Sequence, residues 1–211
     1  MKLSKKNIFL YFAENNLTMN DLNPEFWSDR YKNGQTGWDL GHISPPLKAY
    51  FDQLENKNLK ILIPGCGRGY EGIYLLENGF TNVFLADYSK EALNEVKRNA
   101  PHFLDINLVC ANFFDLEGPF DLIIEQTLFC AIDPSLREDY VAKASQLLSD
   151  DGKIVGLLFN REFEDGPPFG GNQSEYEKQF SKSLQIELME DSYNSVTSRM
   201  GAELFFIAKR K

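Results

Sequence analysis

One stretch limits the possible folds of this chain more than any other: a short apolar run that ends in a glycine-rich turn. The run, Ile61 to Ile63, is too short for a helix, and residues 64–69 follow it with the sequence Pro-Gly-Cys-Gly-Arg-Gly. We expect a buried strand, a tight turn and then a helix. Glycines such as Gly65 and Gly67 can adopt positive φ and let the backbone approach a ligand, while the first N–H groups of the helix point into the same space. The stretch therefore predicts a cradle for a cofactor.

An acidic residue at the end of the next expected strand supports this interpretation. Val83 to Ala86 is apolar and is followed by Asp87, 22 positions after Gly65. A carboxylate there can accept hydrogen bonds from both hydroxyls of a ribose. Dinucleotide sites favour G-x-G-x-x-G, whereas here the third glycine comes one residue earlier. This spacing resembles the first motif of Rossmann-like methyltransferases that bind S-adenosylmethionine, and NAD stays as the alternative.

Along the rest of the sequence, short apolar runs of strand length alternate with segments of helical periodicity, which is typical of an α/β protein. We expect a Rossmann-like fold with a mostly parallel seven-stranded sheet and helices on both faces, in a single domain over residues 1–211. Asp151 and Gly152 are expected to form a turn before the fifth strand. The other expected strands cover 106–110, 120–125, 153–159, 184–190 and 203–209, and the expected helices cover 4–16, 24–32, 47–55, 69–78, 89–99, 134–148 and 174–182.

Composition excludes several classes of partner. The 211 residues carry a net charge of −9, and their Lys and Arg residues are scattered, unlike those of a nucleic-acid-binding protein. No apolar run approaches the length needed to cross a membrane, and the apolar part of the N-terminus is too short for a signal peptide. The three cysteines, Cys66, Cys110 and Cys130, form no metal-binding pair and are expected to be buried thiols. We therefore expect a cytoplasmic protein, monomeric or weakly dimeric, that acts on a small molecule.

Three large aromatic residues surround a glycine-rich loop before the first strand of the sheet. Trp27 and Tyr31 are four positions apart on a helix that should begin at Pro24, with Asn23 as its N-cap, and Trp38 follows the loop. Their rings could pack on the sheet edge as ordinary core residues. They could also form a lid, since an aromatic face attracts a cation and the sulfonium of S-adenosylmethionine is one.

The sequence around these rings is similar to that of a known family. Phe26, Trp27, Tyr31, Gly34, Thr36, Trp38, Asp39, Gly41 and Pro45, continued by residues 63–67, resemble the N-terminal signature of the thiopurine S-methyltransferase family. That family includes the plant halide and thiol methyltransferases. Residues 129–132, with Pro134 and Arg137, resemble the plant branch in particular, and the Gly-Pro-Pro-aromatic segment at 166–169 is a further family trait. The resemblance extends from Phe26 to the end of the sequence.

The resemblance implies an S-adenosylmethionine-dependent methyltransferase whose residues 1–45 form an N-terminal lid. The corner at Asn112 and Phe113 would hold the adenine, although relatives usually have Asp in place of this Asn. Gln126 stands where relatives carry Tyr or Arg. The expected cofactor contacts are Trp27, Tyr31, Trp38, Gly65, Gly67, Asp87, Asn112, Phe113 and Gln126, and the candidates for the substrate pocket are Trp38, Phe129, Phe169 and Gln126.

The expected chemistry is an in-line displacement, which needs positioning and exclusion of water. A nucleophile that is already an anion, such as hydrosulfide, thiocyanate, iodide or a thiolate, needs no base. We therefore assign no certain catalytic residue and no metal ligand. His42 is expected to be an ordinary loop residue, and Arg30 and Arg161 to be solvated or paired charges. The alternatives are a thiopurine or metalloid acceptor, an NAD-dependent oxidoreductase, and a protein that binds the cofactor without turnover.

Overall fold

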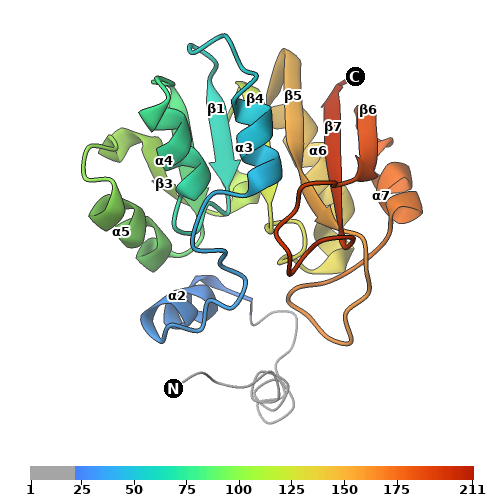
Figure 1. The fold of residues 1–211 in the computed structure, drawn as a ribbon, viewed down its shortest axis with the longest axis horizontal. Coiled ribbons are helices and arrows are strands. Elements are labelled where there is room, and N and C mark those ends of the chain that lie inside the picture. Colours follow the sequence, from blue (N-terminus) through green and yellow to red (C-terminus); the bar gives the residue numbers. More distant parts are fainter. Residues whose placement is uncertain (1–21) are drawn as a thin grey trace.

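The computed structural model describes residues 22–211, so the helix expected over 4–16 lies outside the described residues. Seven strands form one sheet in the order β3-β2-β1-β4-β5-β7-β6 (Figure 1). The five strands from β3 to β5 are parallel, and β7 is antiparallel to both of its neighbours. The strands are β1 (Ile61–Pro64), β2 (Val83–Asp87), β3 (Leu108–Cys110), β4 (Phe120–Gln126), β5 (Leu148–Phe159), β6 (Leu184–Asp191) and β7 (Glu203–Arg210).

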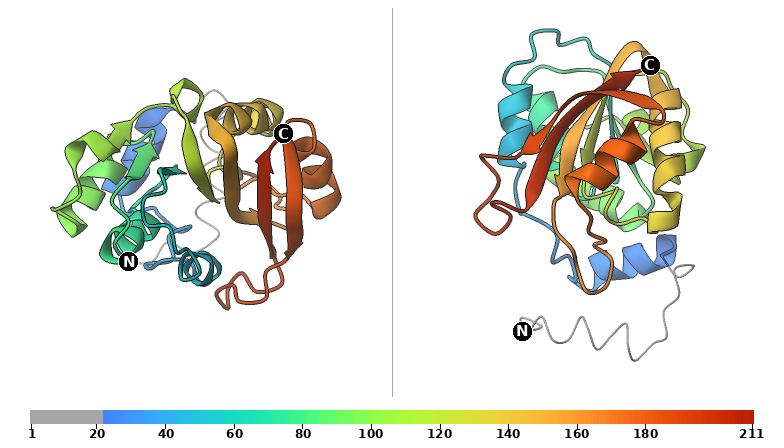
Figure 2. Two further views of the ribbon diagram at one scale, coloured as in Figure 1. Left: turned by 90° about the horizontal axis from the view of Figure 1, so that it is seen from above. Right: turned by 90° about the vertical axis from the view of Figure 1, so that its right-hand side faces the viewer.

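Helices cover both faces of the sheet, as the alternation of buried side chains requires. Ile61 and Ile63 of β1 point to one face and pack with residues of α3, α4 and α5, whereas Leu62 points to the other face. That second face is covered by α6 and α7, which lie on the opposite side of the sheet in Figure 2. The helices are α2 (Pro24–Lys32), α3 (Pro45–Phe51), α4 (Tyr70–Glu77), α5 (Lys90–Asn99), α6 (Arg137–Leu147) and α7 (Gln173–Phe180). The expected fold class is confirmed.

The side chains expected to cap helices occupy those positions. The Asn23 side chain accepts a hydrogen bond from the backbone N–H of Phe26 at 2.9 Å, and Pro24 opens α2. Ser89 caps α5 by accepting from the N–H of Ala92. These bonds satisfy N–H groups that have no partner within their helix. They set the directions in which α2 and α5 leave their loops.

The carboxyl ends of the parallel strands meet at one edge of the sheet, toward which the arrow of β1 points in Figure 1. Helix α2 lies beyond this edge, and the loop 160–172 and the loop 192–202 lie on the same side (Figures 1 and 2). Ligands of open α/β sheets bind outside the carboxyl ends of the strands. The described part of the expected lid is therefore at the functional edge.

Three predictions of local secondary structure were wrong. Residues 105–107 form a 3-10 turn before β3, and Ile106, expected inside that strand, is 80% exposed. Asp151 and Gly152 belong to strand β5, which already begins at Leu148 because that residue pairs with Phe120 across an irregularity in the β4–β5 register. A bulge therefore replaces the expected turn. Helix α3 also ends earlier than expected, at Phe51.

The cysteines differ from one another in burial. Cys66 and Cys130 are buried as expected, but Cys110 is exposed because it ends β3, the strand at the edge of the sheet. All three are free thiols. Within residues 22–211, no group of His, Cys, Asp or Glu side chains could hold a metal ion, and none of the helices is long and apolar enough to span a bilayer.

Candidate active site

The glycine-rich turn brings the backbone to the carboxyl edge without side chains that would fill it. Gly65, Gly67 and Gly69 all have positive φ, at +61°, +53° and +72°. A Cβ atom at Gly65 would lie 2.9 Å from the Leu128 side chain, and one at Gly67 would lie 2.9 Å from the Tyr31 hydroxyl. Other side chains at these positions would be strained and would collide with their neighbours. The turn is thus a cradle closed on one side by α2 and on the other by the loop after β4.

Asp87 lies at the end of β2, beside this cradle. Its Oδ2 accepts a hydrogen bond from the N–H of Gly67 at 2.9 Å, and its Oδ1 accepts from the N–H of Ser89 at 2.8 Å. The residue is 8% exposed, and burial raises its pKa to about 6 although these N–H groups oppose the rise. Each carboxylate oxygen has a second acceptor position, so the group can still receive hydroxyl donors.

The three aromatic residues before the sheet pack against one another edge to face. The Trp38 ring lies 5.5 Å from that of Trp27 and 5.9 Å from that of Tyr31. Tyr31 is buried, and its pKa is raised first by burial and then by the nearby Asp87. Its hydroxyl therefore belongs to the same small region as the glycine turn and the acid. Trp27 and Trp38 are half-buried and complete one aromatic group at the carboxyl edge.

An arginine of the glycine turn holds the loop that follows α2. Arg68 forms ion pairs with Asp39 of that loop and with Glu95 of α5. Asp39 also accepts a hydrogen bond from the N–H of Gly41 at 2.8 Å. The segment that we expected to form a lid is thereby fixed to the cradle next to Trp38.

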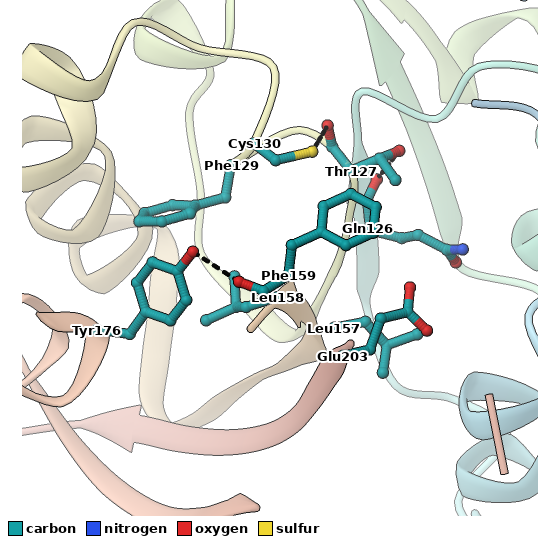
Figure 3. A pocket seen from close by; sticks show the side chains of 9 residues that line it. All are labelled: Gln126, Thr127, Phe129, Cys130, Leu157, Leu158, Phe159, Tyr176 and Glu203. Carbon is teal, nitrogen blue, oxygen red and sulfur yellow. Dashed lines mark hydrogen bonds between the residues drawn. The ribbon is translucent and has the colours of Figure 1, made fainter. Parts of the chain in front are cut away.

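A small pocket opens between the carboxyl ends of β4 and β5. Figure 3 shows the Phe129 and Tyr176 rings on one side of it, Gln126 and Glu203 on the other, and the Phe159 ring between them. Its lining residues are Gln126, Thr127, Phe129, Cys130, Leu157, Leu158, Phe159, Tyr176 and Glu203. The walls combine apolar side chains with a few polar groups, as is usual in small-molecule sites.

Gln126 ends β4 at the junction of this pocket and the cradle. Its Oε1 atom is buried and has no hydrogen-bond partner among the described residues. The next residue, Thr127, has a positive φ of 64°. Buried polar atoms are nearly always paired in folded proteins, and strained backbone is concentrated at functional sites. The Gln126 Oε1 atom could therefore accept a hydrogen bond from a bound ligand.

Glu125 supports the loop after β4 from within the core. One of its carboxylate oxygens accepts from the N–H of Phe129 at 2.9 Å, and the other accepts from the Tyr140 hydroxyl. The side chain is fully buried, and burial raises its pKa to about 7. The carboxyl group thus holds the pocket loop against α6.

Arg137, the first residue of α6, connects this loop to residues 166–171. Its guanidinium donates to the backbone oxygens of Phe169 and Gly170, both at 2.9 Å, and lies 4.8 Å from the centroid of the Phe129 ring. Phe169 in turn donates its N–H to the Cys130 carbonyl at 2.7 Å. Arg137 is 4% exposed, its Nε has no partner, and no carboxylate among residues 22–211 forms an ion pair with it. A buried positive charge without a counter-ion therefore lies behind the pocket wall.

The corner after β3 combines two different environments. The Asn112 side chain is half-buried and accepts a hydrogen bond from the N–H of Phe114 at 3.1 Å. The Phe113 ring is buried and stacks on Tyr140 with 4.5 Å between centroids. Asn112 remains at the carboxyl edge, whereas the Phe113 ring belongs to the core beneath it, and Phe114 is its half-buried neighbour.

The structure also places the residues that we expected to be ordinary. His42 is exposed, with its Nδ1 atom 2.7 Å from the carbonyl oxygen of Ile43. Arg30 is buried above the Phe26 ring, and Arg161 is exposed above the Phe163 ring. The sequence interpretation did not single out Glu125, Arg199 or Glu203. A signal was present for Glu125, an acid directly after apolar Ile123 and Ile124.

These residues fit S-adenosylmethionine on three features: a turn where a Cβ would clash, an acid at the end of β2, and the unpartnered Gln126 Oε1. The fold and the site define a Rossmann-like methyltransferase that uses S-adenosylmethionine. Residues 22–205 match the model of the thiopurine S-methyltransferase family. The chain belongs to that family, and this favours S-adenosylmethionine over NAD.

Individual relatives include plant and bacterial enzymes. The chain is 32% identical to the probable thiol methyltransferase 2 of Arabidopsis thaliana over 161 residues, which cover 72% of this chain and 70% of the relative. It is 27% identical to thiocyanate methyltransferase 1 of Brassica oleracea, covering 84% and 81% of the two chains. It is 23% identical to the thiopurine S-methyltransferase of Vibrio parahaemolyticus, covering 87% and 97%.

Solved structures agree on the fold. The 1,6-didemethyltoxoflavin-N1-methyltransferase of Burkholderia thailandensis, crystallised with S-adenosylhomocysteine, superposes with a TM-score of 0.73. The match covers all of this chain and 92% of that one at 17% identity. A TehB-like methyltransferase from Corynebacterium glutamicum gives a TM-score of 0.63 at 20% identity, covering 89% and 98%. At these identities the likeness concerns the architecture alone.

Proposed function

We propose that this methyltransferase transfers the methyl group of S-adenosylmethionine to a small sulfur or halide anion, such as a thiolate, hydrosulfide, thiocyanate or iodide. The observation that carries the proposal is a small, mostly apolar pocket beside the cradle with the buried Arg137 guanidinium, which forms no ion pair among the described residues, behind its wall. A positive charge in a region of low dielectric favours an anion. The names of the two plant relatives agree with an acceptor of this class.

The reaction needs no proton transfer. A lone pair of the anion attacks the methyl carbon, the bond between that carbon and the sulfonium sulfur breaks, and its electron pair stays on sulfur. The products are neutral S-adenosylhomocysteine and a methylated acceptor. Among the described residues that line the pocket there is no histidine, and the one carboxyl group, that of Glu203, is held in an ion pair with Arg199. The site would act by positioning and by exclusion of water.

In this proposal the cofactor lies across the carboxyl edge between the glycine turn and α2. Asp87 would receive the ribose hydroxyls, and Asn112 would contact the adenine. Gln126 would accept from the amino group of the methionine part. Trp27, Tyr31 and Trp38 would cover the sulfonium, which is a cation and favours aromatic faces. Phe129 and Phe169 would form the apolar wall on the acceptor side.

A thiopurine acceptor is the second candidate, since several bacterial relatives carry that name and match over most of their length. The test is a panel of iodide, thiocyanate, hydrosulfide, thiophenol and 6-mercaptopurine, with the methylated products identified by mass spectrometry. We expect volatile products from the small anions. Turnover of 6-mercaptopurine alone would favour the second candidate. Binding of S-adenosylhomocysteine without turnover of any of these compounds would refute both.

The setting of the reaction is part of the proposal. The net charge of −9 argues against a nucleic-acid partner, and three free thiols fit a reducing cytoplasm. We propose that the chain acts there as a monomer or a weak homodimer on a small molecule.

A further inference from the structure

Arg199 lies in the loop between β6 and β7 and joins parts of the chain that are far apart in sequence. Its Nη2 donates to the carbonyl oxygen of Trp38 at 2.7 Å, across 161 positions of sequence. Its Nη1 donates to Glu203 at 3.1 Å, and its guanidinium lies 5.3 Å from the centroid of the Phe159 ring. Both Glu203 and Phe159 line the acceptor pocket. One buried side chain thus contacts the lid and the pocket together.

The loop after α2 that contains Trp38 and Asp39, called here the lid loop, is held at these two residues by two arginines from different parts of the chain. Arg68, in the glycine turn, pairs with the Asp39 side chain, whereas Arg199 binds the carbonyl of Trp38. The first contact fixes the loop to the cofactor cradle, and the second fixes it to the pocket. A backbone carbonyl bound at 2.7 Å by a buried guanidinium restrains the position of the peptide, and therefore of the indole attached to it.

We propose that Arg199 is a positioning residue for methyl transfer, which sets the Trp38 ring over the reactive end of the cofactor by binding the Trp38 carbonyl. The ion pair with Glu203 orients the guanidinium for this contact. The alternative is that Arg199 and Glu203 form an ion pair whose only role is to stabilise the loop 192–202. The inference depends on the lid lying over the cofactor and does not depend on which acceptor is used.

The chain offers a direct probe of the lid. Its two tryptophans, Trp27 and Trp38, are both in the lid, with their rings 5.5 Å apart. Quenching of tryptophan fluorescence by acrylamide therefore reports on the lid alone. Acrylamide is preferred to iodide, because iodide is a candidate acceptor. S-adenosylhomocysteine serves as the probe ligand, and its effect on quenching needs no turnover.

The principal variant is the double substitution Arg199→Met with Glu203→Gln. Removing Arg199 alone would leave a buried carboxylate unpaired and could unfold the protein, whereas replacing both partners avoids this. Arg210→Met is the matched control. Arg210 also binds a backbone carbonyl, that of Leu148 at 3.0 Å, and a carboxylate, that of Asp150 at 3.2 Å, but at the opposite edge of the sheet.

In the double variant we expect the acrylamide quenching constant to rise at least twofold and S-adenosylhomocysteine to lose its protective effect. We expect kcat to fall by about tenfold or more, with a smaller change in acceptor KM, since small misplacements of a site are costly to turnover. Glu203→Gln alone should leave quenching near that of the parent protein, because the amide oxygen can still accept from the Arg199 guanidinium and so keep its bond to the Trp38 carbonyl. Arg210→Met should match the parent in quenching and kcat.

Arg199→Lys provides a further check, since a lysine keeps the charge but has no fork to reach both partners. We expect its quenching to lie between those of the parent and the double variant. Parental quenching and kcat in the double variant would overturn the proposal and leave only the structural ion pair. The same holds if Glu203→Gln alone reproduces the full increase in quenching, since the carbonyl contact would then be irrelevant.

Discussion

The backbone N–H of Gly67 donates a hydrogen bond to the carboxylate of Asp87 at 2.9 Å, and this bond joins the glycine turn to the acid, the two features on which the proposed cofactor site rests. The glycine turn ends β1, and the acid ends the neighbouring strand β2. Their contact means that the geometry of the turn and the ionisation of the acid are linked. It also fixes where a ribose would have to lie if Asp87 receives its hydroxyls.

We expect Asp87→Ala to weaken binding of S-adenosylhomocysteine by about 1.5 to 3 kcal/mol, the range for hydrogen bonds to a charged group. Because the pKa of Asp87 in the free protein is about 6, the parent should also bind roughly tenfold more weakly at pH 5 than at pH 7. Isothermal titration at both pH values measures this. Asp87→Asn is the control and should show little pH dependence between these values. An unchanged dissociation constant in Asp87→Ala would remove the residue from the site.

Gly67→Ala tests the contact between the turn and α2. We expect loss of cofactor binding, because the new Cβ would meet the Tyr31 hydroxyl and the residue would be strained at a φ of +53°. Adding Tyr31→Phe should restore part of the stability, since it removes the colliding oxygen but not the strain, and the two changes should be non-additive. Thermal unfolding and titration of the three variants measure the coupling. Gly79→Ala, at positive φ in open space, controls for strain alone and should cost about 1 kcal/mol.

Glu125 makes stability depend on pH in a defined direction. Its folded-state pKa of about 7 lies above the ordinary value of 4.5, so the folded protein holds the proton more tightly than the unfolded chain. Stability should therefore fall as pH rises from about 4.5 to about 7, by roughly 3 kcal/mol. Urea unfolding of the parent and of Glu125→Gln at pH 5 and pH 8 isolates this effect, since Asp87 titrates in both proteins. Parallel pH dependence in the two proteins would contradict the expectation.

Arg137 should control the order of the loop 166–171. Arg137→Met removes two hydrogen bonds from a charged group to loop carbonyls, so we expect local opening to become at least about tenfold more frequent. Trypsin cleavage after the exposed Arg161, at the base of this loop, reports on it and can be followed by mass spectrometry. Adding Arg161→Met should abolish that cut and so verify its position. Equal cleavage rates in the parent and Arg137→Met would show that the clamp is unimportant.

Local sequence signals predicted much of the fold. The turn after Ile63, the acid at Asp87 and the caps Asn23 and Ser89 depend on residues close together in sequence, and each lies where expected. The bulge in β5 was missed because Asp-Gly favours a turn locally, whereas pairing of Leu148 with Phe120 keeps the chain in the sheet. Tertiary pairing outweighed local preference there.

The parts of the site that escaped prediction depend on contacts between distant segments. Nothing near Arg199 in the sequence indicates that it meets Trp38, and the pairing of Arg137 with the carbonyls of residues 169 and 170 is equally non-local. The ring of Phe113 was expected near the adenine, but stacking on Tyr140 places it in the core. Its role as a cofactor contact stays a prediction, together with those of the other site residues.

The place of β7 in the sheet has a consequence for biosynthesis. This strand follows all the others in the sequence, yet it lies between β5 and β6 and begins at Glu203 beside the pocket. During translation, the glycine turn, Asp87 and helix α2 are synthesised well before β7. Until β7 is made, β6 has no strand to pair with. Translation of β7 thus completes the sheet beside the pocket, and a chain that ends before residue 203 would lack the strand that pairs with both β5 and β6.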